Sequence, residues 1–86
     1  MSARLRIDYD AGEGALARLL GLVERRGFTI DALEMRGGAP ASLRLDVRAR
    51  DGTRQLATLD LQLRRLHGVH AVTHFPTPVS IASITP

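Results

Sequence analysis

Two stretches of the sequence alternate strictly between apolar and polar side chains. The apolar residues of 3–9 and 43–49 recur at every second position and include Leu5, Ile7, Tyr9, Leu43, Leu45, Val47 and Ala49. A period of two places these side chains on one face of a β-strand. Each stretch therefore predicts a strand with one face in the core and the other in solvent. Arg44, Arg48 and Arg50 are predicted to share the solvent face of the second strand.

Two other stretches carry apolar residues at the spacing of an α-helix. In residues 15–26 the pattern i, i+3, i+4, i+7 is formed by Leu16, Leu19, Leu20 and Val23, and after Thr53 the repeating residues are Leu56, Leu59, Leu63 and Leu66. Such stripes predict helices that pack one face on a core. We expect Thr53 to cap the second helix, and Gly27 and Gly68 to end the two helices.

The remaining segments complete the order of elements. Residues 28–36 and 69–75 predict two further strands, and the apolar phase of the former changes near Ala32, which indicates a bulge. The turn before the first helix offers Asp10 or Glu13 as a carboxylate at the helix start. The order is βαββαβ, the α+β ferredoxin-like arrangement, with two helices on one face of a four-stranded antiparallel sheet. We expect one domain over residues 3–75 and a flexible tail over 76–86.

The sequence lacks the residue patterns that several classes of catalytic and metal site require. There is no cysteine, and the serines do not form a nucleophile–base–acid pattern. His67, His70 and His74 suggest a metal site, but positions i and i+4 on a strand lie roughly 13 Å apart, too far for one ion. We therefore predict no metal site, no catalytic residue and no cofactor in this chain, which leaves a binding or regulatory module.

The charge pattern argues against nucleic acid and membrane partners. All twelve basic residues are arginines, and they are scattered among nine acidic residues without a run of one sign. Only Tyr9, Phe28 and Phe75 are aromatic, too few for a base-stacking surface. Neither an apolar run of membrane-spanning length nor a signal peptide is present, so we expect a cytoplasmic protein. Arginine-mediated RNA binding remains an alternative on the charge argument alone.

The motifs around the first helix resemble those of a known family. Glu13-Gly14-Ala15-Leu16-Ala17-Arg18, followed by Arg26-Gly27-Phe28-Thr29-Ile30-Asp31-Ala32-Leu33, is similar to an ACT domain, and most resembles the small regulatory subunit of acetohydroxyacid (acetolactate) synthase. The resemblance implies a homodimer whose edge strands pair into one larger sheet. It also implies an activating role on a large subunit that carries thiamine diphosphate, Mg and FAD.

The same resemblance implies a site for a branched-chain amino acid at the dimer interface. The effector would meet the first turn near Gly14 and Ala15, and the second strand near Thr29 and Ile30. Valine-sensitive members usually carry Asn at the positions of Ala11 and Thr29, so we expect weak or lost valine feedback, as in the short valine-insensitive isozyme. The alternative is a free-standing ACT-type sensor of a small molecule such as an amino acid.

Overall fold

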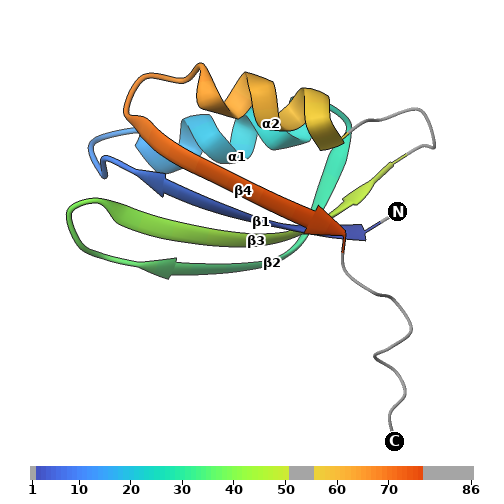
Figure 1. Ribbon diagram of the computed structural model, residues 1–86, viewed down its shortest axis with the longest axis horizontal. Helices are drawn as coiled ribbons and strands as arrows, with labels where there is room; N and C mark the ends of the chain where they lie inside the picture. Colours follow the sequence, from blue (N-terminus) through green and yellow to red (C-terminus); the bar gives the residue numbers. More distant parts are fainter. Residues whose placement is uncertain (1, 51–55, 77–86) are drawn as a thin grey trace, which may run out of the picture.

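The computed structural model, which describes residues 2–50 and 56–76, has the predicted fold. A four-stranded antiparallel sheet has the strand order β2-β3-β1-β4, and both helices cover one of its faces (Figure 1). The opposite sheet face, called the open face below, has no helix over it. The elements are β1 (Ser2–Tyr9), α1 (Ala15–Arg25), β2 (Phe28–Arg36), β3 (Ala41–Ala49), α2 (Leu56–Arg64) and β4 (Val69–Pro76).

The strictly alternating strands form the centre of the sheet, as their pattern requires. β1 pairs with β3 so that Leu5 faces Leu45 and Ile7 faces Leu43, and all four side chains are fully buried beneath the helices. Between them, charged residues point to the open face, where Arg4 meets Asp46 at 2.7 Å. The sequence alternation therefore divides the sheet into an apolar face and an ionic face.

The first helix is rotated relative to the expected stripe. Leu19 and Val23 are buried as predicted, but Leu22 is buried as well, whereas Leu16 and Leu20 are only partly covered. The spacing rule located the apolar side of the helix correctly and misplaced its centre, because Leu16 and Leu20 lie on a flank rather than over the sheet. In α2, Leu56, Leu59 and Leu63 are buried as predicted.

The ends of the helices differ in detail from the prediction. α2 ends at Arg64, before Gly68, because the N–H groups of Arg65 and Leu66 bond to carbonyls three residues earlier in a tighter turn. Arg50 leaves the face that it was predicted to share with Arg44 and Arg48. β3 ends at Ala49, and the Arg50 guanidinium donates to the carbonyl of Glu24 at 2.8 Å, near the C-terminal end of α1.

Two predictions concern residues outside the described ranges. The Thr53 cap lies in residues 51–55, and all but the first residue of the predicted tail lies in residues 77–86. Pro76, which we had assigned to the tail, is the last residue of β4. Among the described residues, no helix is long and apolar enough to cross a membrane.

The predicted bulge in β2 is confirmed and falls at Asp31. Ile30 pairs with Val47 and Ala32 pairs with Asp46, so Asp31 is the extra residue. Its carboxylate accepts two hydrogen bonds, at 2.9 and 3.0 Å, from the Arg48 guanidinium on the open face. This hydrogen-bonded contact with Arg48 holds the pKa of the Asp31 carboxyl below its ordinary value.

The bulge resets which residues of β2 face the helices. Before it, Phe28 and Ile30 pair with β3 residues of the apolar face; after it, Leu33 and Met35 pair with Leu45 and Leu43 of the same face. A regular strand would have turned Leu33 and Met35 to the open face, because side chains alternate. The extra residue therefore keeps the large apolar side chains of β2 on the helix side throughout.

We predict that Asp31→Asn destabilises the protein at neutral pH and not in acid. A carboxyl whose pKa is lowered by folding stabilises the folded state above its unfolded pKa, and this contribution is lost as the pH falls through the folded pKa. Urea unfolding at about pH 7 and about pH 2.5 should show a difference from the natural protein that disappears at the lower pH. Glu13→Gln, which removes an exposed loop carboxylate, is the control. An Asp31→Asn difference that is independent of pH would contradict the role of the ion pair.

Candidate functional site

The first half of the predicted effector site is the turn that leads into α1. Gly14 is the N-cap residue in the left-handed conformation, with φ 78° and ψ −4°, and its carbonyl accepts the N–H of Arg18 at 3.0 Å. The N–H of Ala15 donates to Gly12 within the turn at 3.1 Å, so it is already occupied. The N–H groups of Leu16 and Ala17 come next, and such groups have no partner within a helix. A ligand at this turn would meet these two N–H groups rather than that of Ala15.

Among the described residues, no side chain caps this helix start. α1 has no side-chain cap and no acidic residue in its first turn. Asp10, expected to serve there, instead lies against the end of α2 and the start of β4: its N–H donates to Gly68 at 2.8 Å, and its Oδ1 lies 2.6 Å from Nε2 of His70. The positive end of the helix dipole is therefore left to solvent or to an anionic ligand. Ala11 is exposed in the same turn and offers no polar side chain.

The second half of the predicted site lies at the far end of the same sheet. Thr29 pairs with Arg48, and Arg48 pairs with Ser2 at the beginning of β1. The first turn follows Tyr9 at the other end of β1. Strand residues rise about 3.3 Å each, so some 20 Å separate these two ends, and Figure 1 shows α1 beginning at the opposite end from the start of β2. One chain does not bring Thr29 and Ile30 to Gly14 and Ala15.

Between these two ends runs an exposed apolar surface along the β2 edge. We call it the edge strip; its members are Leu16, Leu20, Ile30, Leu33 and Met35. Within residues 2–50 and 56–76, β2 has a strand partner on one side only. Leu33 and Met35 are 44% and 50% exposed although they lie on the apolar sheet face, and the other three are partly buried.

The helical members of the strip are placed by their neighbours. Arg18 lines a hollow together with Leu66 and His67, so this flank of α1 faces the α2 side. Leu16 and Leu20 project from the opposite flank, because helical positions turn by 100° each. They therefore face the β2 side of the molecule. The sequence pattern predicts both in the core. The apolar stripe of α1 is wider than the surface that the sheet covers, and this width is the sequence signal that some of its residues lie at an edge.

The hollow beside the first turn is too small for an effector. It lies between Tyr9, Ala15 and Leu66 and measures about 10 Å³, room for about one water molecule, whereas small-molecule sites occupy some 300–1,000 Å³. Within the described residues of one chain, the helix start therefore opens onto a surface. A ligand held there would need further walls from another molecule.

The histidines of β4 are held separately. His70 contacts Asp10 of the first turn, and His74 Nδ1 lies 3.6 Å from Asp60 of α2. Among the described residues, no group of three or more histidine and acidic side chains could hold a metal ion. Each histidine instead connects β4 to a neighbouring element.

Comparison with known proteins places this architecture among regulatory domains. A family model described as "ACT domain" matches residues 12–72. The ACT domain of GTP pyrophosphokinase from Chlorobium tepidum is 21% identical, with a TM-score of 0.72 over 87% of this chain and 97% of that chain. No curated protein sequence matches.

Two further solved structures share the fold at lower identity. The C-terminal domain of the MgtC protein from Mycobacterium tuberculosis is 15% identical, with a TM-score of 0.69 over 94% of this chain and 92% of that one. Aspartokinase III from E. coli, solved in complex with lysine and aspartate, is 18% identical, with a TM-score of 0.58 over 85% of this chain and 17% of that one. At these identities the likeness concerns the fold.

We predict that Gly14→Ala lowers the free energy of unfolding by about 1–2 kcal/mol, because an L-residue in the left-handed conformation is strained. The added methyl group would also lie 3.0 Å from Nη1 of Arg18, a flexible side-chain end that can move. Gly12→Ala, two residues earlier, is the matched control: its methyl group meets nothing within 4 Å and its φ is not in that region. Urea unfolding of both variants would test this, and equal stabilities would show that the conformation of Gly14 carries no constraint.

Proposed function

The chain belongs to the ACT domain family, and from this we propose that it is a non-catalytic regulatory domain whose small-molecule site is completed by a second copy of the chain. One observation carries the proposal. The helix start and the beginning of β2, the two parts of the predicted site, lie at opposite ends of the sheet in one chain, and the unpaired edge of β2 runs between them.

A two-fold axis near the middle of β2 would bring the two parts together. Antiparallel pairing of β2 with its copy would set Thr29 of one chain beside Met35 of the other. Met35 pairs with Leu43, close to the sheet end where β1 leads into the first turn. Thr29 and Ile30 of each chain would thus approach the helix start of the partner. Such a dimer uses one surface twice and creates two equivalent sites.

The edge strip supplies a physical reason for this pairing. An open strand edge leaves backbone N–H and C=O groups ready for another strand. Covering the exposed halves of Leu33 and Met35 would contribute roughly 1 kcal/mol for each side chain, since full burial contributes about 1.5–3 kcal/mol. Both chains contribute in a symmetric dimer, so four side chains add to the ladder hydrogen bonds.

The same geometry favours a small amino acid as the ligand. Its carboxylate suits the uncapped helix start, and an aliphatic side chain suits the edge strip. Few polar groups remain to hold the ammonium group: Ala11 has no polar side chain, and Thr29 pairs with Arg48 of the open face, which leaves mainly its backbone for the ligand. Each missing hydrogen bond to a charged group costs about 1.5–3 kcal/mol. We therefore propose weak binding of a branched-chain amino acid.

A second, more specific candidate is the small subunit of acetolactate synthase. The run from Glu13 to Arg18 and the run from Arg26 to Leu33 resemble that subunit, and they support this candidate together with the missing polar side chain at Ala11. In this role the dimer would bind a thiamine-diphosphate-dependent large subunit and bias it toward its active conformation. The carbon–carbon bond would be formed by the large subunit, with its Mg and FAD, and this chain would carry no cofactor.

We predict that the natural chain is a dimer and that Leu33→Asp weakens the dimer by at least about tenfold, because an unpaired carboxylate would be buried in the interface. Sedimentation equilibrium over a range of concentrations would measure the dissociation constant. Leu61→Asp, at an exposed leucine of α2, is the matched control and should leave the dimer intact. A natural chain that stays monomeric, or a Leu33→Asp variant that dimerises as tightly as the natural chain, would exclude the β2 edge as the interface.

Calorimetry and an activity assay separate the two candidates. We expect valine, leucine or isoleucine to bind weakly to the natural dimer, and the monomeric Leu33→Asp variant to lose this binding because its site is divided. Tight binding would favour a free-standing sensor. Addition of the chain to its cognate acetolactate synthase large subunit should raise acetolactate formation if the second candidate is right. No change at a saturating concentration would exclude that candidate and leave the sensor.

A further inference from the structure

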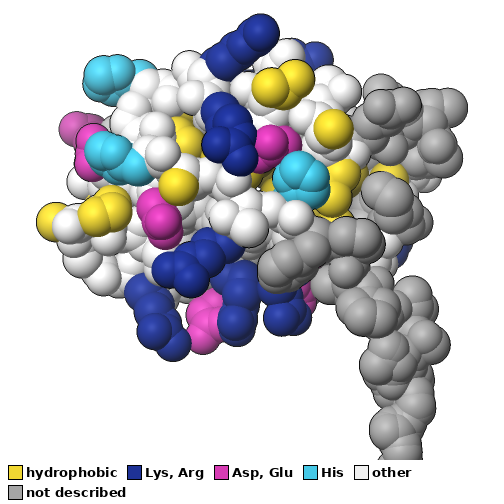
Figure 2. Space-filling model, viewed as in Figure 1, with side chains coloured by type: hydrophobic (Ala, Val, Ile, Leu, Met, Phe, Trp, Pro, Cys, Tyr) yellow, Lys and Arg dark blue, Asp and Glu magenta, His cyan; other side chains and the backbone are white. Residues whose placement is uncertain are grey.

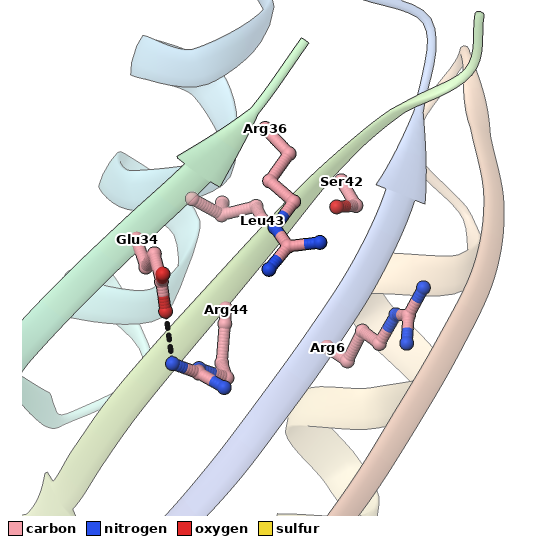
Figure 3. Close-up of a pocket in the computed structure, with 6 residues that line it drawn as sticks. All are labelled: Arg6, Glu34, Arg36, Ser42, Leu43 and Arg44. Carbon is pink, nitrogen blue, oxygen red and sulfur yellow. Dashed lines mark hydrogen bonds and ion pairs between the residues drawn. The ribbon is translucent and has the colours of Figure 1, made fainter. Parts of the chain in front are cut away.

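The open face of the sheet carries a small basic hollow that the regulatory function does not use. It measures about 160 Å³ and is lined by Arg6 of β1, Glu34 and Arg36 of β2, and Ser42, Leu43 and Arg44 of β3. In Figure 3 the Arg36 side chain reaches across toward β3 beside Ser42, and Arg44 contacts Glu34. Three arginines on three adjacent strands therefore line the hollow together with one acidic residue.

The arginines of this hollow are paired less completely than those at the other end of the same face. There, Arg4 lies 2.7 Å from Asp46, and Arg48 makes two hydrogen bonds to Asp31. In the hollow, Arg6 has only a long contact, 3.7 Å, with Asp8. Over the described residues, Arg36 has no carboxylate within ion-pair distance. Figure 2 shows arginines gathered along the side of the molecule away from the helices. On the open face, the arginines without a close carboxylate partner therefore lie at the hollow.

The strand register brings two of these arginines to opposed positions, which is unfavourable when no anion is bound. Arg6 stands directly opposite Arg44 in the β1–β3 ladder. Like charges in directly opposed positions destabilise a sheet. The bulge at Asp31 adds to the effect, because it turns Arg36 as well as Glu34 to the open face. Glu34 beside Arg44 and Asp8 beside Arg6 offset part of this repulsion, and a bound anion would offset more of it.

We propose that this hollow binds a phosphate-type oxyanion through Arg6, Arg36 and Arg44, with the Ser42 hydroxyl as a further donor. Planar guanidinium groups match the oxygens of a phosphate in pairs. Glu34 lies in the hollow and Asp8 lies beside Arg6, so the three arginines keep a net positive charge that favours an anionic ligand. The volume lies well below the roughly 300 Å³ of a typical small-molecule site, so it accommodates a phosphoryl group and not a whole nucleotide. The group could be free or carried on a larger molecule that extends into solvent.

Calorimetry at low ionic strength with inorganic phosphate, pyrophosphate and ADP would test the proposal on the full chain. We expect at least one of the three to bind, and Arg36→Gln and Arg6→Gln each to weaken that binding by about tenfold or more. Arg65→Gln removes the same charge beyond the end of α2 and should change the affinity by less than about twofold. Equal affinities for pyrophosphate and ADP would indicate a free phosphate ligand, whereas tighter binding of ADP would indicate a carried one.

A stability measurement separates binding from a structural role of the arginines. Because it removes one of two like charges at opposed strand positions, Arg6→Gln should unfold at the same or a higher temperature than the natural protein without phosphate. Phosphate should raise the unfolding temperature of the natural protein and not that of Arg6→Gln. The proposal is wrong if no oxyanion binds at millimolar concentration, or if Arg65→Gln loses as much affinity as Arg36→Gln. Binding of a polyglutamate peptide without binding of phosphate would also overturn it and indicate an acidic protein partner.

Discussion

The separation of apolar and ionic side chains on the two faces of β1 and β3 is the constraint on which the rest of the structure depends. These central strands place Leu5, Ile7, Leu43 and Leu45 under the helices, where all four are fully buried. The helices then have one available surface, and their leucines complete the core. β2 joins this sheet only by carrying an extra residue at Asp31, which keeps Leu33 and Met35 in phase with the apolar face.

The edge of the sheet at β2 is only partly covered by a helix. α1 covers the beginning of β2, where Phe28 is buried, but leaves Leu33 and Met35 half exposed along an open strand. The same edge separates the two parts of the predicted effector site by the length of the strand. In a single chain, therefore, the edge strip is partly exposed and the helix start has no pocket beside it large enough for an effector. Two-fold pairing along β2 would remove both deficiencies, which links oligomerisation and ligand binding in one interface.

The two faces of the sheet carry different possibilities for regulation. The proposed amino acid site would lie at the ends of the edge strip, on the side of the helices, whereas the basic hollow lies on the open face. They share the strand β2: its bulge aligns Leu33 and Met35 with the edge strip and directs Glu34 and Arg36 into the hollow. A ligand at either position would contact the same short strand, so binding at one could alter the other through the conformation of β2.

The fold was predictable from the sequence, because alternation at period two and leucines at helical spacing are local patterns that mark the strands, the helices and their buried faces. The sequence also indicated the bulge, from the change of phase near Ala32, and the left-handed glycine that ends the first helix, Gly27. The rotation of α1 was not predictable in this way, since Leu16, Leu20 and Leu22 are equally apolar and their burial depends on the position of the sheet. Three further features depend on residues far apart in the chain. They are the contact of Asp10 with His70, the contact of Arg50 with Glu24, and the position of Arg6 opposite Arg44. Such relations follow from strand register and from the packing of helices on the sheet, which the sequence of one element cannot specify without its neighbours.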